Sequence, residues 1–195
     1  MTEFLNGKID DILVDVANDI KDGGYDPAIL PPKSTSFKMW PIKVTATLKD
    51  GKIEGLSDIN RNGDTAHTDV KVKPMLVSGN LRIGQTKAYI AAFASGGPIS
   101  VSGLTEATID RVDIAYEIET CRGCPMTLTK LDIAVGQINV NIKGLGVLGK
   151  HLGKVTSLAS NLIKGYIINT YKGVVATEIQ NALDDHGALT IPGRS

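Results

Sequence analysis

A glycine-rich segment over residues 144–151, with the sequence GLGVLGKH, has the spacing of a phosphate-binding loop. It follows a strand-like pattern and precedes a helical one, which is the context that such motifs require. A P-loop, however, places Ser or Thr after its lysine to hold Mg²⁺, and here His151 follows Lys150. A dinucleotide-binding fold also needs a further strand that ends in an acidic residue, and no strand pattern follows. The sequence therefore favours a glycine turn from sheet to helix over nucleotide binding.

A second segment, Asp58–Asp64 with Asp69, has the spacing of a calcium-binding loop. Its flanks, which include Ile53, Val70 and Val72, have the pattern of strands rather than of the two helices of an EF-hand. Asn-Gly is the dipeptide that two-residue hairpin turns prefer. We therefore predict a hairpin turn at Asn62–Gly63, and no metal site.

The two cysteines, Cys121 and Cys124, are three positions apart in a loop between strand patterns. A zinc site would need a second pair of ligands, and the three histidines are isolated from one another in the sequence. A redox-active motif would open a helix after a parallel strand, whereas Pro125 leads into a strand. We predict a Cys121–Cys124 disulfide that pins the loop, with two free thiols as the alternative.

Motifs of catalysis are missing from the sequence. It contains neither G-x-S-x-G nor H-E-x-x-H, and Ser100 and Ser102 have no identifiable base nearby. We predict that the protein is not an enzyme and that it uses no cofactor.

Composition narrows the class of protein further. The chain has 195 residues, which predicts a single domain over residues 1–195. Lys plus Arg and Asp plus Glu number 21 each, so the basic excess of a nucleic-acid binder is missing. No apolar run is long enough for a transmembrane helix, and the start of the sequence does not resemble a signal peptide. A cytosolic protein and a mature secreted chain both fit. Aromatic residues make up 5%, so an aliphatic interior could hold an alkyl or isoprenoid ligand or be an ordinary core.

Two amphipathic helices are predicted at the ends of the chain, over residues 2–21 and 152–185. The C-terminal one is the longer and contains no proline, and Gly165 and Gly173 within it indicate a bend or the close approach of another element. Apolar residues recur at helical spacing in both segments. In the C-terminal segment they are Val155, Leu158, Ala159, Leu162, Ile163, Tyr166, Ile167, Tyr171, Val174, Val175, Ile179 and Leu183, and in the N-terminal one Phe4, Leu5, Ile9, Ile12, Leu13, Val16, Ala17 and Ile20.

Between the helices, from Met39 to Lys143, the apolar period changes to two. Asp50–Gly51 is predicted to turn the chain. The phase of the alternation slips twice between Met126 and Ile142, and each slip indicates a bulge or sharp coiling of a strand. Helices that enclose a run of strands, rather than alternate with them, indicate an α+β fold with an antiparallel sheet. Long, bulged strands predict a strongly curved sheet wrapped around the long C-terminal helix.

This layout resembles the group-seven dust-mite allergens. The residues that carry the resemblance are Tyr25-Asp26-Pro27, Leu30-Pro31 and the strand-like Met126-Thr127-Leu128-Thr129. Wider relatives of that family are the juvenile-hormone-binding and takeout-type proteins of insects and the bactericidal/permeability-increasing and lipid-transfer proteins. The resemblance implies a super-roll fold with an elongated apolar cavity, and a location outside cells for a mature chain without its signal peptide. The closely spaced cysteines and the lack of a second tandem half argue against hormone transport specifically.

The function we expect is non-catalytic binding and transport of an apolar small molecule, such as a lipid, fatty acid, retinoid, terpenoid or carotenoid. Tyr166 is the candidate polar anchor, and ordinary core packing is the alternative for every lining residue. An alternative function is an innate-immunity module that recognises microbial lipid or a partner protein through a tip near Lys38, Lys43, Lys49 and Lys52, and a homodimer through strand edges is a further possibility. The candidate lining residues are Ile12, Val16, Trp40, Ile42, Ile90, Ile114, Leu158, Leu162, Tyr166 and Ile167.

Overall fold

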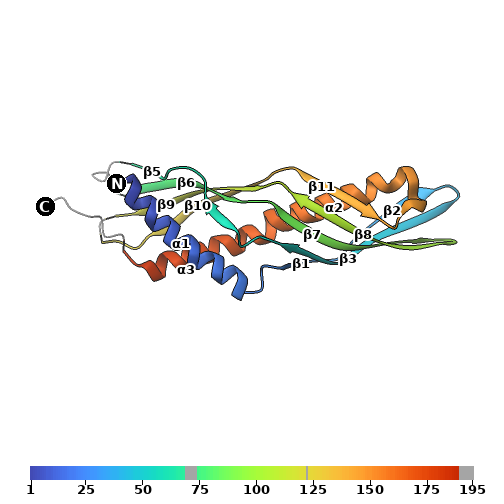
Figure 1. The fold of residues 1–195 in the computed structure, drawn as a ribbon, viewed down its shortest axis with the longest axis horizontal. Helices are drawn as coiled ribbons and strands as arrows, with labels where there is room; N and C mark the ends of the chain where they lie inside the picture. Colours follow the sequence, from blue (N-terminus) through green and yellow to red (C-terminus); the bar gives the residue numbers. More distant parts are fainter. Residues whose placement is uncertain (69–73, 122, 189–195) are drawn as a thin grey trace.

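The computed structural model describes residues 1–68, 74–121 and 123–188, so Asp69, Val70 and Val72 lie outside the described residues. The molecule is elongated, with the long C-terminal helix running along most of its length (Figure 1). No helix in the described part of the chain is both long and apolar enough to cross a membrane.

Two antiparallel sheets make up the β structure. In the six-stranded sheet, β1 (Ala28–Leu30) and β2 (Lys33–Met39) both pair with β3 (Ile42–Glu54), followed by β7 (Thr86–Gly96), β8 (Ile99–Ile109) and β11 (Ile138–Lys143). In the five-stranded sheet, β4 (Ile59–Arg61) and β5 (Ala66–His67) both pair with β6 (Met75–Ile83), followed by β9 (Val112–Thr120) and β10 (Thr127–Val135).

Four stretches of chain run through both sheets, because β3 leads into β4, β6 into β7, β8 into β9 and β10 into β11. We call the crossing points the waist; they are residues 55–58, 84–85, 110–111 and 136–137. Backbone hydrogen bonds from Asp110 to Gln137 and from Gly136 to Arg111 hold two of these crossings together. A Cβ at position 136 would lie 2.0 Å from Oδ1 of Asp110, so the glycine makes room for this carboxylate.

The two phase slips between Met126 and Ile142 are explained by this arrangement. The first is a register shift between Leu128 and Lys130 in β10. The second falls at residues 136–137, where the chain leaves the five-stranded sheet for the six-stranded one. The prediction of strand irregularities is confirmed at both places.

The turn predicted at Asp50–Gly51 is wrong. β3 continues through this dipeptide, and the register to β7 shifts between Lys49 and Lys52. Asp50 has a φ of 52°, which marks an irregular position inside a long strand. A dipeptide suited to a tight turn is thus used as a bulge that curves the sheet.

The hairpin turn predicted at Asn62–Gly63 is also wrong. β4 and β5 flank this dipeptide but both pair with β6, in consecutive registers, rather than with each other. The Asn62 amide donates to the carbonyl of Asn80, so the dipeptide interrupts one edge strand. Gly63 provides the positive φ of 91° that this interruption needs.

The predicted C-terminal helix is confirmed. A short 3₁₀ helix, η1 (Gly146–His151), leads into α2 (Leu152–Tyr166), then a π-helical turn, η2 (Ile167–Tyr171), and then α3 (Lys172–His186). The residues on both sides of the π-helical turn keep right-handed helical backbone angles, so the helix is not broken there. A π-helical turn lies between Gly165 and Gly173, where the sequence indicated a bend or the close approach of another element.

The helices close the open side of each sheet. α2 contacts β11 at one edge of the six-stranded sheet and β1 and β2 at the other. In the second half, α3 contacts β10 and α1 (Thr2–Asp22) contacts β4, and the two helices also contact each other. The α+β fold class is therefore confirmed: a curved antiparallel sheet is rolled against a long C-terminal helix.

The six-stranded sheet buries several alanines, namely Ala46, Ala88, Ala92, Ala94 and Ala107, beside large residues such as Leu48, Ile53 and Ile90. The buried residues of the five-stranded sheet include Val77, Leu81, Ile83, Val112, Ile114, Tyr116 and Ile118.

Candidate functional site

Apolar space lies between α1, α3 and the five-stranded sheet, and we call it the chamber. Two small openings in the packing form it, each with a volume of about 10 Å³, which is roughly the space that one water molecule needs. They share Ile9, Ile12 and Ile118, so they are neighbouring lobes of one space. The lining residues are Leu5, Lys8, Ile9, Ile12 and Leu13 of α1, Val77, Leu81, Tyr116, Ile118, Thr120 and Met126 in or beside the sheet, and Ile179 of α3.

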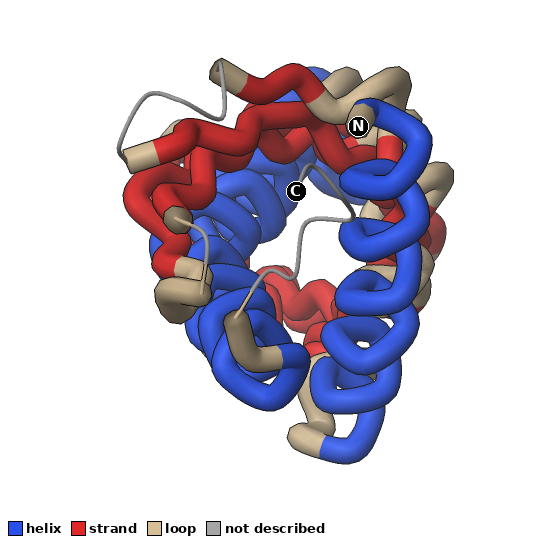
Figure 2. The backbone as a smooth tube through the Cα atoms, turned by 90° about the vertical axis from the view of Figure 1, so that its left-hand side faces the viewer, coloured by secondary structure: helices blue, strands red, loops and turns tan. Residues whose placement is uncertain are grey.

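The amphipathic patterns of the sequence place these residues together. Leu5, Ile9 and Ile12 recur every three or four positions and so lie along one face of α1. Alternate residues of β9, including Tyr116 and Ile118, are buried on the face of the sheet that α1 covers. Viewed from this end of the molecule, the sheet lies across the top and helices line both sides (Figure 2).

Tyr116 brings a polar group to the chamber. Its side chain is 5% exposed, and its hydroxyl lies 3.3 Å from the hydroxyl of Thr65. Burial raises the pKa of Tyr116, so the phenol remains protonated and can donate a hydrogen bond. Gly79 lies opposite Tyr116 in the adjacent strand, and a Cβ there would lie 2.6 Å from the tyrosine hydroxyl oxygen. Glycine thus makes room for this ring.

Polar contacts fix α1 to one edge of the sheet. The guanidinium of Arg61 donates from Nε and Nη2 to the two carboxylate oxygens of Asp10, over 2.9 and 3.1 Å. The amide of Thr65 donates to the side-chain oxygen of Asn6, over 2.9 Å. A paired geometry of this kind orients the helix as well as holding it.

The other wall of the chamber is held in a similar way. The side-chain oxygen of Gln180 in α3 accepts from the Leu128 amide over 2.8 Å, and its nitrogen donates to the Met126 carbonyl over 3.1 Å. His186 of α3 and Asp15 of α1 are joined by a contact of 2.9 Å between Nε2 and Oδ2. The chamber therefore has an apolar interior and a polar rim that links all three of its walls.

The structure distributes the ten predicted lining residues along the whole molecule. Ile12 lines the chamber. Val16 is buried farther along α1, and Ile114 is buried farther along β9. Leu158, Leu162 and Tyr166 lie on α2 and Ile167 begins the π-helical turn, while Ile90 is buried in the six-stranded sheet. Ile42 is partly buried at the distal end of β3.

The prediction that Trp40 lines the interior is wrong. It lies in the turn between β2 and β3 and is 92% exposed, so it lines no interior space. The alternation of apolar residues that begins at Trp40 continues along β3 only from Ile42, and the tryptophan itself lies beyond the end of the sheet.

Sequence reasoning named only Ile12 of the residues that line the chamber. The helical period identified Ile9, Leu13 and Ile179 as apolar, and the strand alternation identified Tyr116 and Ile118. That signal shows which residues are buried. It does not show which buried face borders a space, because this depends on how far the helices stand from the sheet.

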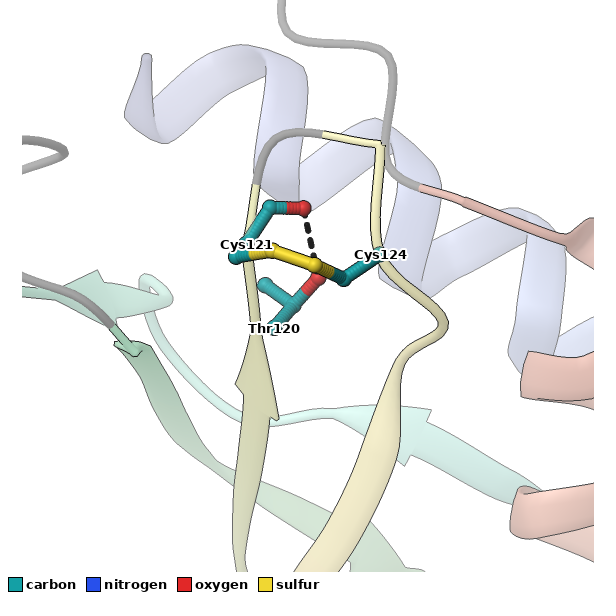
Figure 3. Close-up of a disulfide and its surroundings, with 3 residues drawn as sticks. All are labelled: Thr120, Cys121 and Cys124. Carbon is teal, nitrogen blue, oxygen red and sulfur yellow. Dashed lines mark hydrogen bonds between the residues drawn. A yellow bond between two sulfur atoms is a disulfide. The ribbon is translucent and has the colours of Figure 1, made fainter.

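The predicted disulfide is present. Cys121 and Cys124 are bonded in the loop between β9 and β10, with Cα atoms 4.9 Å apart (Figure 3). The Cys124 amide donates to the Cys121 carbonyl over 3.0 Å, and the Thr120 hydroxyl is 3.5 Å from the same oxygen. The bridge closes the loop next to Thr120 and Met126, at one end of the chamber.

The structure explains the glycine-rich segment as a packing feature. The strand before it, β11, is antiparallel to β8 rather than part of a parallel sheet. Gly144 has a φ of 86°, and a Cβ there would lie 2.7 Å from the Ser102 carbonyl oxygen. Gly144 thus lets the chain turn closely over β8. In the part of the chain that the structure describes, no group of three or more His, Cys, Asp or Glu side chains could hold a metal ion.

Comparison with known protein families shows the family to which this chain belongs. The model of the Group 7 allergen family matches residues 5–184. The chain belongs to this family. Comparison of this group 7 allergen with curated protein sequences finds no match.

Solved structures share the fold of this chain. It matches lipopolysaccharide binding protein with a TM-score of 0.55 and 14% identity, over 89% of this chain and 36% of that one. The chain thus spans about a third of that protein's length. Takeout 1 of Epiphyas postvittana has a TM-score of 0.46 and 14% identity, over 95% and 91% of the two chains. The first similarity establishes the super-roll fold.

Proposed function

We propose that this group 7 allergen is a non-catalytic carrier of an apolar small molecule, held in the chamber between α1, α3 and the five-stranded sheet. The observation that carries the proposal is the almost entirely aliphatic lining that α1, α3 and the five-stranded sheet share. The openings are small in this structure, so a ligand would enter by moving α1 away from the sheet. A lipid, fatty acid, retinoid, terpenoid or carotenoid would each present an alkyl or isoprenoid chain to these walls.

Burial of the ligand's apolar surface supplies the affinity. At about 25 cal/mol per Å², a chain that buries roughly 300 Å² gains about 7 kcal/mol before the entropic cost of binding and the cost of opening the chamber. Tyr116 and Thr65 offer hydroxyl groups at the chamber wall, where they would orient a polar head group. Tyr116 thereby takes the anchoring role that the sequence suggested for Tyr166.

Two further observations support the proposal. Lipopolysaccharide binding protein, which shares the fold, binds a lipid-containing molecule as its name states. The Cys121–Cys124 disulfide is typical of oxidising compartments, which agrees with a location outside cells.

Displacement of a fluorescent fatty-acid probe tests the proposal, together with organic extraction and mass spectrometry of the purified protein. We expect saturable probe binding, and recovery of an apolar compound from the protein. Val77→Phe, which places a larger side chain at the chamber wall, should weaken probe binding at least fivefold. Val44→Phe makes the same change at a buried position of β3 in the other half and is the matched control. Equal effects of both variants, or no probe binding by the wild type, would reject the chamber as the site.

The alternative function, recognition of a lipid or partner protein through one tip, has an observation in its favour as well. The end of the molecule opposite the chamber carries an exposed tryptophan beside lysines.

A further inference from the structure

The distal end of the molecule combines one large exposed apolar side chain with several lysines. The turn between β2 and β3 carries Trp40, which is 92% exposed and is the single tryptophan of the chain. Lys38 and Lys43 face each other across the two strands immediately behind it, and both are exposed. We call this end the tip. It lies at the right of Figure 1, while the amino terminus lies at the left.

Other elements extend the tip. His151 at the end of η1 stacks on Phe37 of β2, with ring centroids 5.2 Å apart, and Nζ of Lys154 lies 5.3 Å from the centre of the same ring. These contacts bring Lys150, Lys154 and the exposed Val147 to the same end as Trp40. The turn between β7 and β8 also lies here, because Gly97 packs against Ile42.

The charges of the molecule are segregated although their sum is zero. Residues 33–49 contain four lysines and no acidic residue, and residues 92–105 and 144–160 contain no acidic residue either. None of Lys38, Lys43, Lys150 and Lys154 forms an ion pair within the described residues. By contrast, α1 at the opposite end contains six acidic residues and two lysines. The tip therefore has an uncompensated positive charge.

We propose that the tip docks on the surface of a bilayer that contains anionic phospholipids, with Trp40 inserted at the level of the head groups and the surrounding lysines contacting lipid phosphates and carboxylates. Tryptophan prefers the interface between membrane and water, because its ring is apolar and its indole N–H remains hydrated. Lysine side chains beside it extend toward the negative surface, and each contributes to attraction.

The shape of the tip favours a bilayer over a protein partner. A stable protein interface needs roughly 800 Å² on each side. The tip is instead the narrow end of an elongated molecule, formed by two hairpin turns and one short helical segment (Figure 1). A soft surface can surround such a protrusion without a preformed complementary groove. The inference goes beyond the proposed carrier function and does not depend on the chamber, which lies in the other half.

The single tryptophan allows a direct test with the complete chain. Its fluorescence emission should shift to shorter wavelength when vesicles of phosphatidylcholine with phosphatidylserine are added. Vesicles of phosphatidylcholine alone should cause little shift, and high salt should reverse the effect. Quenching by lipids brominated near the head group should exceed quenching by lipids brominated near the chain end.

Charge variants that retain Trp40 give the decisive comparison. Lys38→Gln/Lys43→Gln should weaken vesicle binding about 25-fold, at about fivefold per lysine. Lys21→Gln/Lys87→Gln removes two exposed lysines elsewhere and should cause less than a threefold change. Trp40→Ala should reduce vesicle flotation, and circular dichroism should show an unchanged fold because this side chain packs on little.

Several outcomes would overturn the proposal. They are no emission shift with anionic vesicles, an equal shift with neutral vesicles, and equal losses in the two double variants. A blue shift produced by soluble heparin would instead identify a soluble anionic partner, and a shift that grows with protein concentration alone would identify a second copy of the chain.

Discussion

The hydroxyl of Tyr171 donates a hydrogen bond to the backbone carbonyl of Leu56. Tyr171 ends the π-helical turn, and Leu56 lies at the waist between β3 and β4. This bond therefore fixes the long helix to the point where the chain passes from one sheet to the other. Burial, together with the nearby charge of Asp26, raises the pKa of Tyr171 far above its ordinary value, so the hydroxyl stays protonated. The carboxylate of Asp26 accepts from the amides of Gly55 and Ser57 at the same crossing.

Tyr171→Phe should lower the free energy of unfolding by about 1–3 kcal/mol, because it leaves the buried Leu56 carbonyl without its donor. Urea unfolding followed by circular dichroism measures the change. Tyr166→Phe is the control, since the half-buried Tyr166 forms no hydrogen bond through its hydroxyl within the described residues, and its effect should stay below about 0.5 kcal/mol. Equal losses would show that Tyr171 does not fix the helix in this way.

The sequence predicts the elements of this fold better than their connections. The period of the long helix, the strand alternation and the Cys121–Cys124 bridge are local signals, and each is confirmed. Asp50–Gly51 and Asn62–Gly63 mislead because a dipeptide that suits a tight turn equally suits a bulge. Which of the two forms depends on the strand paired alongside, and that strand is distant in the sequence.

The position of the chamber could not be predicted for a related reason. Ile12 and Ile118 are buried like Ile90 and Leu162, so burial alone does not show that the first pair lines the chamber. The chamber depends on how α1 and α3 pack on the five-stranded sheet, and these contacts join residues that are far apart in the sequence. Trp40 was predicted to line the interior but is exposed, because strand periodicity does not show where the sheet ends.

Gly173→Ala should stabilise the protein. A Cβ at this position would meet nothing within 4 Å, so the close approach suggested by the sequence does not occur there. Alanine costs less entropy in a helix, which should add about 0.5–1 kcal/mol to the free energy of unfolding. Gly103→Ala is the contrasting variant and should destabilise, because its Cβ would lie 2.0 Å from the Lys143 carbonyl oxygen. Thermal denaturation should show shifts of opposite sign; the same sign for both would contradict the packing described.

Gly79→Ala should displace the ring of Tyr116 and cost about 1–3 kcal/mol of stability. It should also alter probe affinity, because Tyr116 lines the chamber. A double-mutant cycle with Tyr116→Leu checks the cause: in that background Gly79→Ala should cost much less, since the tyrosine ring is gone. Additive losses would mean that the glycine acts through the backbone of β6 instead.

Acid should remove the contribution that Asp113 makes to the free energy of unfolding. Burial acts to raise its pKa, but hydrogen bonds from Arg82 and Arg111, over 2.7 and 3.0 Å, outweigh this and hold the pKa below its ordinary value. An aspartate whose pKa is lower in the folded protein than in the unfolded chain stabilises the fold at pH values above the unfolded-state pKa of about 3.9. This contribution is lost as the pH falls through the pKa of the folded state. Because the site is about a third exposed, Asp113→Asn should cost under about 1 kcal/mol at pH 7.

The pH dependence of urea unfolding distinguishes this effect from a general loss of packing. The difference between wild type and Asp113→Asn should shrink as pH falls below about 3.9. A difference that persists unchanged, or grows, in acid would show that the two arginines do not stabilise the ionised carboxylate.

Photo-crosslinking with a diazirine-bearing fatty acid, followed by peptide mass mapping, tests the carrier proposal most directly. Binding in the chamber predicts labelled residues within Leu5–Leu13 of α1 and Tyr116–Thr120 of β9, and competition by unlabelled fatty acid. Saturable labelling confined to α2 and β11, or labelling that unlabelled fatty acid does not reduce, would contradict it.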